Sequence, residues 1–275
     1  MRLTVRTVVC GLTALALFAA APASAQYQRY RPPTGPAAES WHVEFSFGTW
    51  QPGPDFTVSG ASGGLAGTEI DARNDLGVQS KLLEEFRLVL KPGQKHRFRL
   101  VYEPGSYSAS TVLARTIGFG GQTLASGATV ATSVDWTSWR FGYEYDFISR
   151  PSGFVGFITD IRYDNVSVSL ASPPVAAATR VRTPFPMIGG VVRIYPAQYL
   201  GLTAEFTGMK LPGRVRELTG YDGHAFDLDL YATITFGRSV GVRTGYRSMN
   251  VYYEWEMSHA DLTRRGPYVM GVVRF

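Results

Sequence analysis

The feature that most constrains this chain is a strict alternation of side-chain type over long stretches. Successive side chains of a β-strand point to opposite faces of a sheet, so a period of two predicts strands. At about 130–147 one face carries Trp139, Phe141, Tyr143, Tyr145 and Phe147, and the other carries Arg140, Gly142, Glu144 and Asp146. The last eight residues, YVMGVVRF, alternate in the same way and end on Phe275. We therefore predict an all-β fold.

Ten segments of the chain carry this pattern, and they predict ten antiparallel strands. The strands are expected at about 41–50, 82–91, 96–107, 130–147, 154–170, 187–195, 200–210, 224–236, 240–250 and 266–275. The connections alternate between long and short, with long ones at 51–80, 108–129, 171–186, 211–223 and 251–265. Gly120-Gly121 suggests a hairpin inside one of the long connections. Eight or twelve strands are the alternatives, if the first two long connections pair differently.

The N-terminal residues 1–25 have the three parts of a secretory signal peptide. Arg2 and Arg6 precede an apolar run at 8–20, and Ala23-Ser24-Ala25 is an A-x-A cleavage site. The apolar run is too short to cross a bilayer of about 30 Å as a helix. We expect cleavage after Ala25 and export of the chain.

Cleavage would leave 250 of the 275 residues and remove Cys10, the single cysteine, so no disulfide is expected. Residues 26–39 are rich in proline, glycine and polar side chains, and we expect a disordered lead-in there, followed by one domain at 40–275.

The composition is unusual for a soluble domain and narrows the class. Charged residues make up only 18%, aromatic residues reach 13%, and there are 30 glycines. The net charge of +5 falls to +3 without Arg2 and Arg6, and it shows no basic run, so nucleic acid is not an expected partner. No segment after the signal peptide has about 18 or more consecutive apolar residues, which excludes a spanning helix. Together these features are typical of a transmembrane up-and-down β-barrel.

The final strand with its terminal Phe275 resembles the closing strand of bacterial outer-membrane β-barrel proteins, in which this aromatic residue serves as an assembly signal. The resemblance implies residence in the cell outer membrane of a Gram-negative bacterium, with the N-terminus on the periplasmic side. It also implies contact with outer-membrane lipid and lipopolysaccharide, and with the barrel-assembly machinery through the last strand. Arg264-Arg265 is one candidate contact for lipopolysaccharide phosphates.

In such a barrel the apolar faces point outward, because an Arg or Lys at mid-depth on the lipid side costs about 2–4 kcal/mol. The opposite faces are then predicted to form an ion-pair network in the lumen. Its expected members are Arg97, Arg99, Glu103, Arg140, Glu144, Asp160, Arg162, Arg193, Glu205, Asp227, Asp229, Arg243 and Arg247, with Glu44, Glu85 and Arg87 beside them. Aromatic girdles are expected at the two membrane interfaces, formed by Trp41, Trp50, Trp136, Trp139, Tyr145, Phe147, Tyr163 and Phe275.

The leading functional hypothesis is a non-enzymatic, structural or surface-interaction barrel with a largely plugged lumen. Eight strands enclose only packed side chains, whereas 16–18 strands leave an aqueous channel, and ten lies nearer to the first case. The first alternative is a narrow, porin-like channel for small polar solutes or ions.

The second alternative is a surface hydrolase, either a protease or an enzyme that modifies lipid A. Tyr221, Asp222 and His224, with Asp227 and Asp229, resemble in residue type alone the acid and histidine pairs of omptin proteases. A second acidic pair across the cleft has no convincing counterpart. We therefore assign no catalytic residues. No zinc, redox or nucleotide-binding motif occurs, and no metal or cofactor is expected.

Overall fold

The computed structural model describes residues 39–59, 67–214, 217, 220–255 and 258–275. The predicted signal peptide and most of the predicted lead-in, up to residue 38, lie outside the described residues. The strands in chain order are β1 (Val43–Trp50), β2 (Gly53–Ser59), β3 (Ile70–Asp71), β4 (Leu83–Leu90), β5 (His96–Val112), β6 (Ile117–Phe119), β7 (Gln122–Leu124), β8 (Thr129–Arg150), β9 (Gly153–Ser172), β10 (Val175–Ala197), β11 (Leu200–Lys210), β12 (Tyr221–Phe236), β13 (Val240–Trp255) and β14 (Ser258–Arg274).

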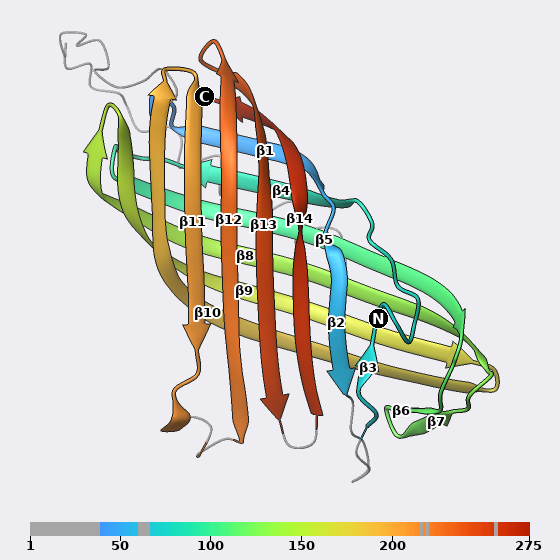
Figure 1. Cartoon of the computed structure of the whole chain (residues 1–275). Helices are drawn as coiled ribbons and strands as arrows, with labels where there is room; N and C mark the ends of the chain where they lie inside the picture. Colours follow the sequence, from blue (N-terminus) through green and yellow to red (C-terminus); the bar gives the residue numbers. More distant parts are fainter. Residues whose placement is uncertain (1–38, 60–66, 215–216, 218–219, 256–257) are drawn as a thin grey trace, which may run out of the picture. The chain divides into compact units, whose positions relative to one another are not determined.

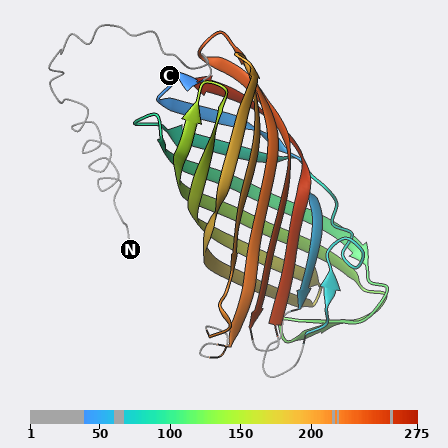
Figure 2. The same ribbon diagram turned by 60° about the vertical axis from the view of Figure 1, so that its left-hand side comes forward.

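Ten of these strands form a closed antiparallel ring. β1, β4, β5 and β8 to β14 each pair with the next, and β14 pairs back with β1, with Phe47 opposite Gly271. The two ends of the ring meet where Phe275 N donates to Val43 O at 2.8 Å and His42 N donates to Phe275 O at 2.6 Å. Figures 1 and 2 show the ring from two sides. The prediction of an all-β barrel with ten strands is confirmed.

The two ends of the barrel differ in their connections. At one end, which we call the short-turn end, the connections are 91–95, 151–152, 198–199 and 237–239. Phe275 and the start of β1 also lie at this end. At the opposite end, the hairpin end, the segment that connects β1 to β4 forms β2 and β3, and the segment that connects β5 to β8 forms the β6–β7 hairpin (Figure 1). The turn of that hairpin is Gly120-Gly121, as predicted, with φ angles of 57° and 76°.

Two of the predictions of a long connection are wrong, because the two segments form β-strands. The 171–186 segment turns at Pro173-Pro174 and then forms the first half of β10, and 251–265 is largely the hairpin of β13 and β14. Pro184 and Pro186 suggested a loop. They are tolerated because β10 pairs with β11 only from Ile188 onward, which leaves this half of β10 as a sheet edge.

The first barrel strand is also longer than predicted, and it is interrupted. β1 and β2 both pair with β14, and the break between them falls at Gln51-Pro52. Gly266 lies opposite the break. A Cβ at this position would lie 2.0 Å from the Gln51 carbonyl oxygen, and the Trp50 indole donates to the Gly266 carbonyl at 3.1 Å. Only glycine allows this close approach.

An apolar belt covers the outside of the ring. Five neighbouring strands contribute one aromatic row, in which each residue is the register partner of the next: Phe47, Phe86, Tyr102, Trp139 and Tyr163. Ring centroids along the row are 4.8, 6.0 and 4.3 Å apart for the first three pairs. Of the predicted girdle residues, Trp139, Tyr145, Phe147, Tyr163 and Phe275 lie exposed on this outer surface.

Three predicted girdle residues do not lie in the belt. Trp41, Trp50 and Trp136 are buried inside the barrel, with exposed fractions of 5%, 1% and 0%. Trp136 is three residues from Trp139, and an odd spacing in a strand places two side chains on opposite faces. Trp50 has the same relation to Phe47. Trp41 precedes β1 and is not bound by the alternation of that strand.

The lumen as the candidate functional site

Charged side chains fill the interior of the barrel from the short-turn end to its middle. In the described part of the chain, eleven basic and ten acidic side chains are buried, and the partly buried Glu39 brings the acids to eleven. All thirteen residues predicted to line the lumen are among the buried ones. The alternation of the strands puts them there, since every second residue must face inward.

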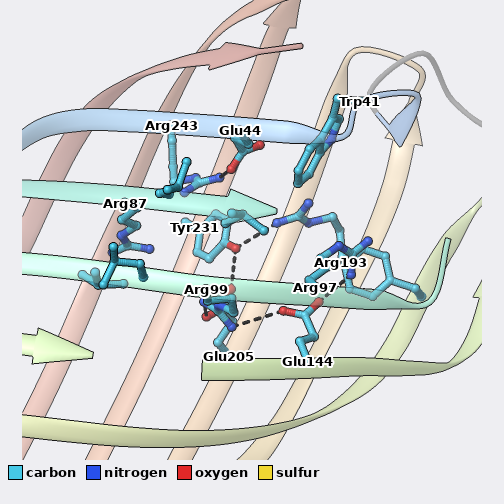
Figure 3. Close-up of a pocket in the computed structure, with 15 residues that line it drawn as sticks. Trp41, Glu44, Arg87, Arg97, Arg99, Glu144, Arg193, Glu205, Tyr231 and Arg243 are labelled. Carbon is cyan, nitrogen blue, oxygen red and sulfur yellow. Dashed lines mark hydrogen bonds and ion pairs between the residues drawn. The ribbon is translucent and has the colours of Figure 1, made fainter. Parts of the chain in front are cut away.

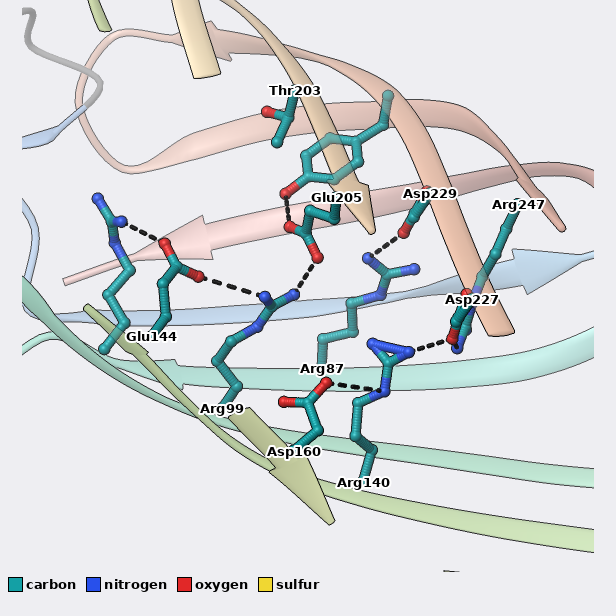
Figure 4. Close-up of polar contacts among 12 residues, drawn as sticks. Arg87, Arg99, Arg140, Glu144, Asp160, Thr203, Glu205, Asp227, Asp229 and Arg247 are labelled. Carbon is teal, nitrogen blue, oxygen red and sulfur yellow. Dashed lines mark hydrogen bonds and ion pairs between the residues drawn. The ribbon is translucent and has the colours of Figure 1, made fainter. Parts of the chain in front are cut away.

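Asp227 of β12 is the centre of the network in the middle of the lumen (Figure 4). It accepts two hydrogen bonds from Arg247, at 2.9 Å from Nε and 2.6 Å from Nη2. Arg140 also donates to it, and Arg162 Nη1 lies 3.4 Å from Oδ2. Arg162 and Arg247 in turn both pair with Glu103. Three guanidinium groups from three strands thus share one carboxylate, which ties β8, β9 and β13 to β12.

A second branch connects the middle of the lumen to the short-turn end. Arg87 Nη1 pairs with Asp229 at 2.9 Å. Arg99 bridges Glu144, at 3.2 Å, and Glu205, as Figure 4 shows. The pairs Arg87–Asp229 and Arg99–Glu205 cross the interior between strands that are not neighbours in the ring, whereas Arg99–Glu144 joins the neighbouring strands β5 and β8. They therefore fill the lumen and also cross-link its walls.

The predicted list of network members omitted six residues of the network, although the alternation at 130–147 had already placed Asp146 on the polar face. The six residues are Glu39, Lys91, Asp146, Asp164, Arg264 and Arg274. Asp146 and Asp164 were detectable, since they continue the alternation of Arg140 and Arg162 on the same strand faces. Glu39 was not detectable, because it precedes the first strand and falls in the segment predicted to be disordered.

The interior changes character along β8, which shows how the lumen is layered. From the short-turn end its inward side chains include Asp146, Glu144, Arg140, Trp136 and Val134. Charge therefore gives way to an aromatic side chain and then to aliphatic ones. The sequence prediction of a polar plug describes only the first part of this series.

Arg264 forms the boundary between the charged and apolar parts. Its guanidinium lies 3.8 Å from the ring centroid of Trp136 and 4.9 Å from that of Trp50, and it pairs with Glu103 at 3.4 Å. The prediction that Arg264 lies on the outer rim is wrong, since the side chain is fully buried. Its neighbour Arg265 is exposed and pairs with Asp55. Cation–π contacts of this kind stabilise a buried guanidinium.

Beyond Arg264 the interior of the hairpin end is a packed apolar core. β2, β3, the β6–β7 hairpin and the ends of the long strands contribute buried side chains to it. They include Phe56, Ile70, Leu76, Tyr107, Leu113, Ile117, Leu124, Val134, Leu170, Met187, Val251 and Leu262. The hairpins at this end thus close the barrel from within.

Two interior cavities are small. One lies at the short-turn side of the ionic network, lined by Arg97, Arg99, Glu205 and Tyr231 among others (Figure 3), and its volume is about 30 Å³. The other lies in the apolar core beside Phe119 and Leu262 and has the same volume. Each holds about two water molecules at most.

The group proposed for a hydrolase is not assembled. His224 lies on the outer face of β12, where its ring stacks on Tyr252 at a centroid distance of 5.2 Å. Asp227 and Asp229 lie on the inner face of the same strand and pair with arginines. A histidine and two carboxylates on opposite faces of one strand cannot share a substrate. Within the described ranges, no group of three or more His, Cys, Asp or Glu side chains is placed to hold a metal ion.

Within the described residues, no helix is long and apolar enough to cross a membrane.

Comparison with known proteins identifies the fold of the chain by structural similarity alone. No protein-family model matches the chain, and no curated protein matches it in sequence. Among solved structures, the outer membrane protease OmpT from Escherichia coli superposes with a TM-score of 0.58 at 7% identity, over 85% of this chain and 97% of that one. The fold is that of a bacterial outer-membrane β-barrel.

Other outer-membrane barrels also match at lower scores. The translocator domain of the autotransporter NalP from Neisseria meningitidis gives a TM-score of 0.47 at 12% identity, over 85% of this chain and 88% of that one. The transport unit of the autotransporter AIDA-I from Escherichia coli gives 0.35 at 9% identity, over 96% of this chain and 98% of that one.

Proposed function

We propose that this chain is a non-enzymatic and non-conducting outer-membrane barrel, a closed scaffold that presents its long hairpins at the cell surface. The observation that carries the proposal is the continuous filling of the lumen. An ionic network, the layer of Arg264 with Trp50 and Trp136, and an apolar core follow one another along the axis. A hydrated ion would have to cross all three.

The energetics favour a closed lumen over a gated one. The ionic network is balanced in charge, and breaking one buried pair by losing a partner costs about 3–5 kcal/mol. An ion would then meet the apolar core, where hydration is lost without compensation. A channel that opened through this path would have to break both layers at once.

Planar-bilayer recording on refolded protein tests the proposal. The expected result is no single-channel conductance at any voltage, with insertion verified in the same membranes by flotation of labelled protein with liposomes. Stable openings whose conductance changes in Arg140→Ala or Arg243→Ala would contradict the closed scaffold and favour a narrow channel. A known porin, inserted under the same conditions, is the positive control.

We propose the outer membrane as the location, with the short-turn end in the periplasm and a signal peptide removed after Ala25. Lipid contacts the apolar belt, and the assembly machinery contacts β14 with its terminal Phe275. Lipopolysaccharide is the proposed partner at the hairpin end, where Arg180, Arg182 and Arg265 are exposed. Arg264 is not part of this surface, because its side chain is buried.

A further inference from the structure

A carboxylate from outside the ring closes the short-turn end of the lumen. Glu39 lies just before β1, and its Oε2 accepts from Lys91 Nζ at 2.7 Å and from Arg97 Nη2 at 3.0 Å. Its Oε1 accepts from Arg193 Nη1 at 3.2 Å and from the Tyr195 hydroxyl. Each carboxylate oxygen therefore has two donors. The four donors come from the 91–95 turn, from β5 and from β10.

The barrel itself holds the cationic donors in position. The guanidinium carbons of Arg97 and Arg193 lie 4.0 and 5.2 Å from the centroid of the Phe154 ring. Lys91 Nζ lies 5.3 Å from the centroid of the Trp41 ring. Figure 3 shows Arg97 and Arg193 side by side in this part of the lumen. Aromatic faces beside the cations stabilise them in addition to the carboxylate that fills the site.

The charges of this cluster depend on Glu39. Within 4.0 Å, and among the described residues, Lys91 and Arg193 form an ion pair with Glu39 and with no other carboxylate. Arg97 also pairs with Glu144 and Asp146. Without Glu39 the interior would hold eleven buried bases and ten buried acids. The interior would then carry one excess positive charge, and Lys91 and Arg193 would each lose their ion pair.

The protonation of Glu39 is consistent with this role. Burial by itself would raise the pKa of its carboxyl group, but Arg97, Lys91 and Arg193 outweigh burial and hold the pKa well below its usual range. The group is therefore an anion at any physiological pH.

We propose that Lys91, Arg97, Arg193 and Tyr195 form a binding site for a carboxylate, and that Glu39 is its internal occupant. A carboxylate ligand presented at this end of the barrel competes with Glu39 for the same donors. Two donors on each of two coplanar oxygens suit a planar monoanion better than tetrahedral phosphate, whose second charge the site does not balance. The proposal rests on the fold and is independent of whether the barrel conducts.

Chemical rescue of Glu39→Ala by acetate tests the proposal. The variant lacks Cγ and the carboxylate, and acetate supplies the same atoms. Urea unfolding of refolded barrel is followed at neutral pH in increasing sodium acetate, against sodium chloride at equal ionic strength. Acetate is expected to raise the unfolding midpoint of this variant until the site is saturated. At ten times the dissociation constant the unfolding equilibrium constant should fall by about 11-fold.

Three controls separate this site from a general salt effect. Wild-type protein should respond much less than Glu39→Ala, because acetate must first displace Glu39, which is tethered to the chain and binds the same donors. Glu39→Gln fills the site with a neutral amide and should not respond. Glu39→Ala combined with Arg193→Gln removes one donor, and the rescue should be lost.

Each outcome decides the question. The proposed site would be refuted if acetate and chloride had equal effects on the unfolding midpoint of Glu39→Ala. It would also be refuted if acetate shifted the midpoint of either control variant as much as that of Glu39→Ala. Phosphate that binds as tightly as acetate would overturn its assignment to carboxylates. If Glu39→Ala does not refold in chloride, the refolding yield in acetate becomes the measurement: recovery supports the proposal, and no recovery refutes it.

Discussion

Replacing Asp227 by Asn tests whether the lumen network carries the stability of the barrel. The substitution keeps the shape of the side chain and removes the charge that Arg140, Arg162 and Arg247 share. Removing one partner from a buried ion pair costs about 3–5 kcal/mol. Because the amide oxygen still accepts a hydrogen bond, we expect about 3 kcal/mol, which raises the unfolding equilibrium constant by about two orders of magnitude.

Reversible urea unfolding in lipid vesicles measures this loss. Asp55→Asn is the matched control, since it is the same chemical change at a carboxylate that pairs with Arg73 at 3.2 Å and Arg265 at 3.6 Å on the surface. Exposed pairs of this kind contribute about 0–1 kcal/mol. The two variants therefore differ in burial and not in chemistry.

A loss for Asp227→Asn no larger than for Asp55→Asn would refute the reasoning. A double-mutant cycle sharpens the test. Adding Arg247→Gln removes one of the cations left without its anion, so the two losses should be less than additive, with a coupling of about 0.5–3 kcal/mol.

Three further predictions concern the wall, the belt and the hairpin end. Gly189→Ala should destabilise the barrel by about 1–3 kcal/mol in the same assay, because its Cβ would overlap the backbone of β11, whereas Gly93→Ala, with open space around it, should not. Phe141→Arg should cost about 2–4 kcal/mol, and Phe141→Leu much less, because the position faces lipid. The hydrogen bond from Arg115 holds the pKa of Asp75 below its ordinary value. The Asp75 carboxylate therefore stabilises the fold at a pH above its ordinary pKa, and this stabilisation is lost as the pH falls through the lowered pKa. The difference in unfolding midpoint between wild type and Asp75→Asn should shrink over that acidic range, and a difference independent of pH would contradict it.

Alternation alone was sufficient for the ring. It predicted ten strands, and it separated Arg140 from Phe141 and Asp227 from Phe226 by face. It failed where residue type was given more weight than spacing. Trp50 and Trp136 were assigned to the lipid side because they are aromatic, although their positions relative to Phe47 and Trp139 placed them inside.

Other features had no local signal in the sequence. The first half of β10 contains Pro184 and Pro186, and its identity as strand depends on its being an edge, which only the tertiary arrangement determines. The contact of Glu39 with Arg193 spans 154 residues and involves a segment outside any strand. The apolar core of the hairpin end is built from β2, β3 and the β6–β7 hairpin, whose burial follows from how they fold into the ring.

Quenching of tryptophan fluorescence by lipids with brominated acyl chains tests the assignment of the two faces most directly. Trp139 lies on the outer surface of β8, and Trp136, three residues away, is fully buried in the lumen. In refolded protein, Trp139→Phe should remove a large share of the fluorescence that bromine quenches, and Trp136→Phe should leave that share unchanged. Loss of the quenchable fluorescence in Trp136→Phe, with Trp139→Phe unaffected, would contradict an outward apolar belt and a filled interior.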